Sequence, residues 1–281
     1  MIVYSSRTPE IDASDALAGV RALAERVAGG GGHAEAAELL VEYGRLEAGA
    51  LDACMPERDE ATPLAELLRA GAMETGRILR ASWRGEPFAA SVDELRRVLD
   101  ALGEALPRGR IPHAVPEGYA YYALYPETYL AAAARFVEEA RPARAVVVGV
   151  RSIGTSLSAA VAAEVEARGC EARSFTVRPR GHPFDRRVVL GPRLAAEVER
   201  RRDAWFLVVD EGPGLSGSSF AGTAAALAEL GVPNERIVFF PSWIPDGGGF
   251  VSAAARERWP RHRKVTASFE EVWTEPGRLA A

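Results

Sequence analysis

The sequence predicts an α/β protein: a mostly parallel sheet with helices on both faces, preceded by an α-helical N-terminal region. Two observations carry this prediction. Beyond residue 117, apolar runs of strand length alternate with segments of helical periodicity, as in repeated strand–helix units. Before residue 107, the apolar pattern is that of helices. We therefore expect a helical region over residues 1–112 and an α/β domain over residues 113–281.

The first region is expected to hold four helices. Apolar residues recur at helical spacing in residues 16–27, 34–53, 63–80 and 92–106. A run of glycines ends the first helix, and Ser91 with Glu94 three residues later predicts a capping box for the fourth. Three prolines in residues 107–116 indicate a linker to the second region.

Strands and helices alternate in the second region. The predicted strands are residues 118–124, 145–150, 171–177, 205–210 and 236–240, and the predicted helices are 126–140, 155–168, 192–202 and 218–230. The run at 145–150 is apolar throughout, which is typical of a parallel strand buried on both faces. Right-handed crossovers bring the carboxyl ends of such strands to one edge, and ligands bind beyond that edge.

Composition excludes several classes of protein. The chain has 281 residues, enough for one large domain or two small ones, and its net charge of −5 argues against a nucleic-acid partner. Its cysteines, Cys54 and Cys170, have no second Cys or His at the spacing of zinc ligands, and they argue against a disulfide scaffold. No apolar run approaches the ~20 residues of a membrane span, and residues 1–15 lack the pattern of a secretory signal. We therefore expect a cytoplasmic protein with no membrane partner.

The loop that follows the strand at 205–210 is the strongest candidate site. Asp210 and Glu211 end this strand, and a loop rich in Gly and Ser then leads into a helix. Converging backbone amides, serine hydroxyls and the helix N-terminus would together form a phosphate cradle. The two acids would bind sugar hydroxyls, or Mg²⁺ through water. The expected cradle residues are Gly214, Leu215, Ser216, Gly217, Ser218 and Ser219.

This string resembles the phosphoribosyl-pyrophosphate (PRPP) motif of type I phosphoribosyltransferases. The family pattern is a hydrophobic strand, two acids, a few variable residues, and a short loop of Thr or Ser with Gly. Here Asp210 and Glu211 match the acids, and residues 216–219 match the phosphate loop. The intervening residues 212–215 make the loop slightly longer than the family's usual spacing. The resemblance covers residues 117–245 and implies a Rossmann-type, phosphoribosyltransferase-like sheet.

The resemblance also gives roles to two further loops. Residues 148–154 resemble the family's pyrophosphate loop, in which Arg151 would neutralise pyrophosphate and the amides of Ser152 and Gly154 would donate to it. Residues 177–187 stand where the family carries a flexible catalytic loop that closes over pyrophosphate. Some members use a Lys there, which this loop lacks, so arginines must serve. The charged residues of this loop are Arg178, Arg180, His182, Arg186 and Arg187.

In this family a variable hood covers the acceptor. The candidates here are residues 241–249 and the helical N-terminal region. Trp243 would stack on a planar acceptor, or it would simply pack against its own chain.

The implied activity is that of a pentosyltransferase. PRPP would bind with Mg²⁺, and phosphoribose would pass to an unidentified small acceptor as pyrophosphate leaves an oxocarbenium-like sugar. Two alternatives stay open: a regulatory protein that binds PRPP or a nucleotide without transferring it, and a nucleotide phosphorylase or hydrolase. The implied partners are small molecules, and a homodimer is expected because dimers are common among proteins that resemble this one.

Overall fold

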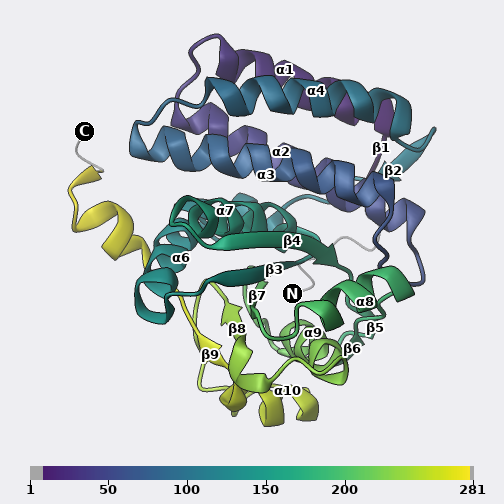
Figure 1. Ribbon diagram of the computed structural model, residues 1–281, viewed down its shortest axis with the longest axis vertical. Coiled ribbons are helices and arrows are strands. Elements are labelled where there is room, and N and C mark those ends of the chain that lie inside the picture. The colour runs from purple at the N-terminus through teal and green to yellow at the C-terminus, as the bar shows by residue number, and fades with distance from the viewer. Residues whose placement is uncertain (1–8, 279–281) are drawn as a thin grey trace.

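A five-stranded parallel sheet forms the centre of the computed structural model, which describes residues 9–278 (Figure 1). Its order is β4-β3-β7-β8-β9, and every neighbouring pair is parallel. The strands are β3 (Arg144–Val150), β4 (Glu171–Val177), β7 (Trp205–Val209), β8 (Ile237–Phe240) and β9 (Arg263–Lys264). The α/β class with a parallel, Rossmann-like sheet is thereby confirmed.

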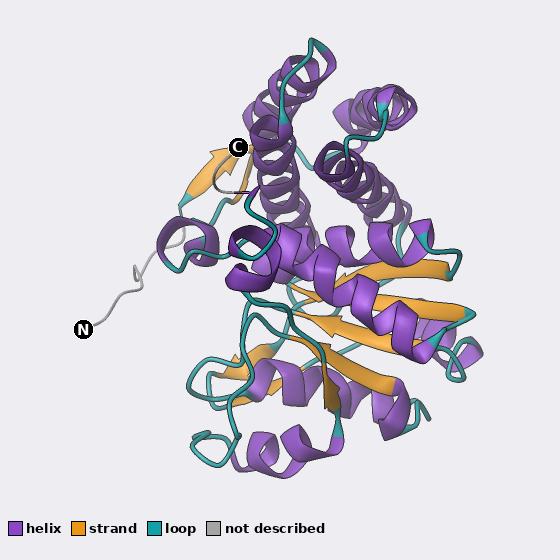
Figure 2. Cartoon of the chain, turned by 90° about the vertical axis from the view of Figure 1, so that its left-hand side faces the viewer, coloured by secondary structure: helices purple, strands orange, loops and turns teal. Residues whose placement is uncertain are grey.

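Helices cover both faces of this sheet (Figure 2). Alternate residues of β3 point to opposite faces, so that Val147 packs with α6 and α7 while Val146 and Val148 pack with α8, α9 and α10. The helices are α6 (Pro126–Ala140), α7 (Ile153–Ala167), α8 (Pro192–Arg200), α9 (Ser218–Glu229) and α10 (Ala253–Arg258). A short π-helical segment, Glu270–Thr274, follows β9.

The first region forms four helices, close to the predicted ranges: α1 (Ala13–Ala28), α2 (His33–Cys54), α3 (Pro63–Arg84) and α4 (Ala89–Ala105). Of these, α2 and α3 pack on α7, while α1 and α4 form an outer layer on them (Figure 1). Two glycines permit the close approach: a Cβ on Gly44 would lie 2.8 Å from the Cβ of Ser156, and one on Gly76 would lie 2.4 Å from the carbonyl oxygen of Ala159. Because Ala159 and Ala160 of α7 join the apolar core of the bundle, the two regions pack as one body.

Several local expectations were wrong. Residues 118–124 do not form a strand: α5 (Glu117–Tyr121) lies there, outside the sheet, with Tyr121 and Tyr122 exposed. Aromatic residues favour strands, but here the backbone bonds within the segment: the amides of Tyr122 and Leu124 both donate to the Gly118 carbonyl, at 3.1 and 3.2 Å. Ser91 does not cap α4, which begins two residues earlier at Ala89.

The sequence analysis did not predict two short antiparallel strand pairs, helix α10 or strand β9. Strand β1 (Glu10–Asp12) pairs with β2 (Arg110–Pro112), inside the expected linker. Strand β5 (Arg180–His182) pairs with β6 (Asp185–Arg187), inside the expected catalytic loop.

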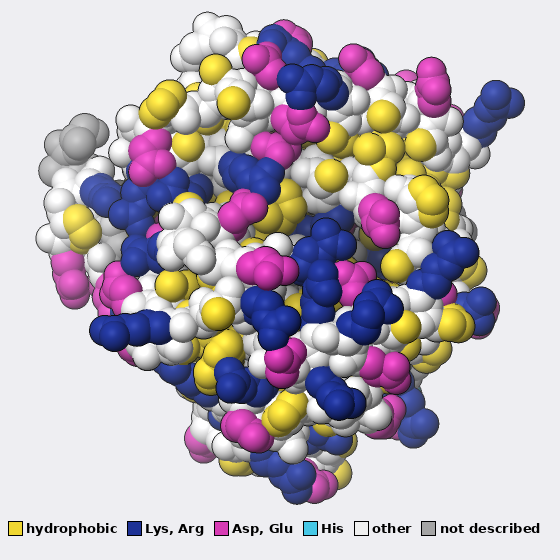
Figure 3. Space-filling model, viewed as in Figure 1, with side chains coloured by type: hydrophobic (Ala, Val, Ile, Leu, Met, Phe, Trp, Pro, Cys, Tyr) yellow, Lys and Arg dark blue, Asp and Glu magenta, His cyan; other side chains and the backbone are white. Residues whose placement is uncertain are grey.

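The surface carries mixed charge. On the face in Figure 3, Lys and Arg side chains are interspersed with Asp and Glu rather than gathered by sign. Within residues 9–278, no helix has both the length and the apolar composition needed to cross a membrane.

Candidate functional site

A cleft of about 1090 Å³ opens beyond the carboxyl ends of β3 and β7. The chain runs from β3 to β4 on one side and returns through α8 to β7 on the other, so the two strands flank the switch point of the sheet. The loop after β3 and the loop after β7 lead to opposite sides of the sheet. They therefore diverge at this point and leave space for a ligand between them. Helix α2, the segment 112–122 and the β5–β6 hairpin supply the remaining walls.

The cleft gathers many of the residues that the sequence singled out. Those that line it are Arg151, Ser152, Arg178, Asp210, Glu211, Gly214, Leu215, Ser216, Ser219 and Trp243. Those that lie outside it are Gly154, Arg180, His182, Arg187, Gly217 and Ser218. Gly154 packs under the β7 loop, where a Cβ would lie 2.4 Å from the Val209 carbonyl oxygen.

The loop between β7 and α9 is shaped by glycine and serine. Gly214 and Gly217 both have positive φ angles, and the Gly217 amide donates to the Pro213 carbonyl at 2.7 Å. The Ser218 amide is held by the Ser216 hydroxyl, at 3.3 Å. Helix α9 begins at Ser218, and Ser216 and Ser219 on either side line the cleft. A phosphate here would meet two hydroxyls and the positive end of α9.

The two acids after β7 face different surroundings. The Asp210 carboxylate accepts from the Glu211 amide at 2.8 Å. The pKa of Asp210 is raised to about 7: burial is the main cause and the Glu211 charge adds to it, while the hydrogen bond from the Glu211 amide and the charges of Arg186 and Arg178 oppose the rise. A cation or a sugar hydroxyl beside Asp210 would favour its charged form.

Glu211 turns toward α5. A Cβ on Gly118 would lie 2.7 Å from the Glu211 Cδ, so only glycine leaves space for this carboxylate. Burial raises the pKa of Glu211, and the charge of Glu117 raises it further. The hydroxyl of Tyr129 donates to the carbonyls of Asp210 and Glu211 at 2.8 and 3.0 Å and fixes the loop backbone. Neither Gly118 nor Tyr129 belongs to a sequence motif that would have predicted this role.

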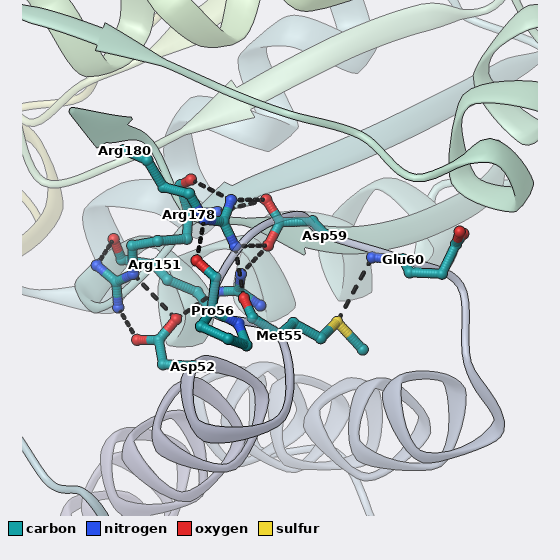
Figure 4. A network of polar contacts seen from close by, with 8 residues as sticks. All are labelled: Asp52, Met55, Pro56, Asp59, Glu60, Arg151, Arg178 and Arg180. Atoms are coloured by element: carbon teal, nitrogen blue, oxygen red, sulfur yellow. Dashed lines mark hydrogen bonds and ion pairs between the residues drawn. The ribbon is translucent and has the colours of Figure 1, made fainter.

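The arginines expected to hold pyrophosphate are engaged by acids of the first region (Figure 4). Arg151 is buried, pairs with Asp59 and lies 3.2 Å from Asp52. Arg178 donates to both Asp52 oxygens and, at 2.7 Å, to the Arg151 carbonyl. Arg180 donates to both Asp59 oxygens, each at 3.0 Å. These three side chains are therefore parts of a fixed ion-pair network.

The rest of the expected catalytic loop is an ordered hairpin on α9. The hydroxyl of Ser218 donates to the Pro183 carbonyl at 2.7 Å, and a Cβ on Gly222 would lie 2.3 Å from the Arg186 carbonyl oxygen. The side chain of Arg186 lines the cleft, and among the described residues no ion pair involves it. Arg187 points the other way, is 80% exposed and pairs with Asp185. Of these two arginines of the expected loop, Arg186 therefore lines the cleft and Arg187 does not.

His182 has a local contact only. It is exposed at the end of β5, and its Nδ1 accepts from the Phe184 amide at 3.2 Å. This places the imidazole outside the cleft, away from the position that its expected catalytic role requires.

Exposed apolar side chains surround the mouth of the cleft. Trp243 is 51% exposed and packs over Gly212, where a Cβ would lie 2.9 Å from the indole Nε1. Tyr122, Phe184 and Leu215 are likewise exposed and line the cleft from three other segments. Exposed apolar groups around a polar floor are typical of a site for a ligand with a planar part.

A magnesium ion fits the acids of this site. Among residues 9–278, no three His, Cys, Asp or Glu side chains are grouped as a metal cage. Mg²⁺ commonly needs only one or two carboxylates, since water and substrate phosphates complete its shell. Asp210 and Glu211 both line the cleft and supply carboxylate oxygens of this kind.

Comparison of the chain with protein-family models, curated proteins and solved structures found no match.

Proposed function

We propose that this chain is a phosphoribosyltransferase that binds PRPP with Mg²⁺ and transfers phosphoribose to a small acceptor. One observation carries the proposal: the Asp210–Ser219 loop follows a buried strand at the switch point of a parallel sheet and faces a cleft. A phosphate cradle, two carboxylates and a cation then surround one space. This is the arrangement that a phosphorylated sugar with a charged leaving group requires.

Each group in the cleft has a role in this proposal. The hydroxyls of Ser216 and Ser219 and the N-terminus of α9 bind the ribose phosphate. Asp210 accepts hydrogen bonds from the ribose hydroxyls, and Arg186 lies beside the departing pyrophosphate. When bound to Asp210 and Glu211, Mg²⁺ would neutralise part of the pyrophosphate charge. The Asp210 carboxylate also favours the positive charge that develops on the sugar.

The mouth of the cleft would receive the acceptor. Trp243 and Tyr122 offer exposed aromatic faces, and Glu117 and Glu211 offer hydrogen-bond acceptors between them. A planar acceptor that carries N–H groups matches these features.

Calorimetric titration with PRPP, with and without Mg²⁺, tests the donor site. We expect magnesium-dependent binding that Asp210→Asn removes. Asp203→Asn is the matched control, because Asp203 is an exposed partner of Arg144 outside the cleft. Equal binding by the wild type and Asp210→Asn would contradict the proposal.

A second candidate function is binding without transfer. It is favoured by the ion pairs that Asp52 and Asp59 make with Arg151, Arg178 and Arg180, because these arginines are then less available to a leaving group. Release of pyrophosphate in an acceptor screen distinguishes the two: a transferase releases it, whereas a PRPP-binding regulator binds the ligand and leaves it intact.

A further inference from the structure

The ion-pair network contains two aspartates whose accessibility differs (Figure 4). The side chains of Asp59 and Arg151 are each 1% exposed, so no ligand reaches this pair. The side chains of Asp52 and Arg178 are 19% and 27% exposed, and both line the cleft. Asp59 is therefore a structural anchor, whereas the Asp52–Arg178 pair faces the space in which a ligand would bind.

The Asp52 carboxylate occupies the position beside Arg178 that an anionic group of a ligand would otherwise occupy. It lies in the last turn of α2, at the end of the helix where the dipole disfavours an acid. It accepts from Arg178 through both carboxylate oxygens, and its Oδ1 lies 3.2 Å from the Arg151 Nε. A bidentate carboxylate of this kind is the geometry by which arginine also holds a phosphate.

The network keeps a surplus of positive charge. Arg151, Arg178 and Arg180 face Asp52 and Asp59, three cations against two anions. Arg186 adds a further cation from the hairpin on the same cleft. Anions are therefore attracted to this side of the cleft even while Asp52 is in place.

We propose that Asp52 is a specificity-determining residue, which holds Arg178 in the unliganded protein and which a ligand must displace. A single carboxylate that took its place would gain nothing, because it would only repeat the contacts of Asp52. A diphosphate can contact Arg178 and Arg186 together, and this second contact drives the exchange. Asp52 thus selects for polyanionic phosphates. The inference rests on the proposed function only in placing an anion at this side of the cleft.

Titration with inorganic pyrophosphate tests this competition. We expect Asp52→Asn to bind pyrophosphate about tenfold more tightly than the wild type, since Arg178 no longer has a charged partner to lose. Glu38→Gln is the matched control, because Glu38 is on the same helix, pairs with Arg26 and lies outside the cleft. Its affinity should equal that of the wild type. Unchanged or weaker binding by Asp52→Asn would overturn the inference.

Acetate separates competition from a general change in charge. In Asp52→Ala, which removes the carboxylate and leaves space for a small anion, acetate should occupy that space and weaken pyrophosphate binding, while at the same ionic strength it should leave the wild type unaffected. An equal response of both proteins would also count against the role of Asp52.

A measurement on the wild type serves if Asp52→Asn does not fold. Pyrophosphate should release the Asp52 carboxylate and increase its labelling by carbodiimide and glycinamide, as read by mass spectrometry. Unchanged or reduced labelling would contradict the inference. Failure of the inference would leave PRPP binding and turnover intact, whereas failure of the proposed function would leave the pyrophosphate competition intact.

Discussion

The two sides of the cleft are assembled in different ways. The phosphate-loop side is one continuous segment, residues 210–219, whose shape comes from its own glycines and serines. The arginine side joins Arg178 to Asp52 across 126 positions of sequence and Arg180 to Asp59 across 121. A loop whose shape depends on its own residues can be predicted from the sequence. Whether an arginine is accessible to a ligand depends also on acids from distant segments, which the sequence does not place beside it.

The largest effect is expected from removing the anchor of the arginine side. Asp59→Ala should lower the free energy of unfolding by about 3–5 kcal/mol, because Arg151 and Arg180 lose their buried counter-charge. Urea unfolding at neutral pH measures the loss. Asp203→Ala, which breaks an exposed pair, should cost about 0–1 kcal/mol. Similar losses for the two variants would mean that the network is not structural.

The next effect is expected from two neighbouring arginines of the β5–β6 hairpin, Arg186 and Arg187. Arg186→Gln should weaken pyrophosphate binding by about ten- to a hundredfold, the range of one charge-assisted hydrogen bond. Arg187→Gln should leave the affinity unchanged, since Arg187 points away from the cleft. Titration of both variants under the same conditions decides between them. A larger loss for Arg187→Gln would reverse the assignment of the two faces.

The sequence identified the sheet and its loops well. The strands β3, β7 and β8 can be recognised without knowing their neighbours, because a strand buried on both faces is an apolar run. The order of loops along the chain then placed residues 151–154 and 210–219 at one edge.

The sequence did not indicate which charges would meet. Asp52 and Asp59 lie in a helix end and a loop with no motif around them, and their partners follow more than ninety positions later. Glu47, which reads as one of the polar residues of a solvated helix face, is buried against Arg69. Such pairs depend on how α2 docks on the sheet, and that contact is set by small residues such as Gly44.

The docking of the bundle supplies a third test. Gly76→Ala should cost about 1–3 kcal/mol of stability, because the added Cβ would lie 2.4 Å from the Ala159 carbonyl oxygen in α7. Gly19→Ala is the matched control on α1, where a Cβ meets nothing within 4 Å, and it should stabilise by about 0.5–1 kcal/mol. Thermal unfolding of both variants shows whether each substitution raises or lowers the stability. A neutral Gly76→Ala would show that the bundle and the sheet are not tightly docked.

A last test concerns the pH dependence of stability. The folded pKa of Asp210 is raised from 3.8 to about 7, so the folded state binds this proton more tightly and loses the associated stability as pH rises from 3.8 through 7. Asp210→Asn should therefore be more stable than the wild type at pH 8, by on the order of 4 kcal/mol, because each unit of raised pKa corresponds to about 1.4 kcal/mol. The difference should vanish below pH 4. Denaturation at several pH values checks this, and a destabilised Asp210→Asn at pH 8 would contradict the buried position of the carboxyl.

In the proposed complex, the ribose phosphate of PRPP binds in the loop at residues 214–219 and the pyrophosphate group of PRPP lies beside Arg186. A crystal structure of the wild-type protein with PRPP and Mg²⁺ tests this most directly. We expect the ribose phosphate to accept hydrogen bonds from the hydroxyls of Ser216 and Ser219, and Asp210 to lie beside the ribose. PRPP bound in the opposite orientation, or outside the cleft, would contradict it.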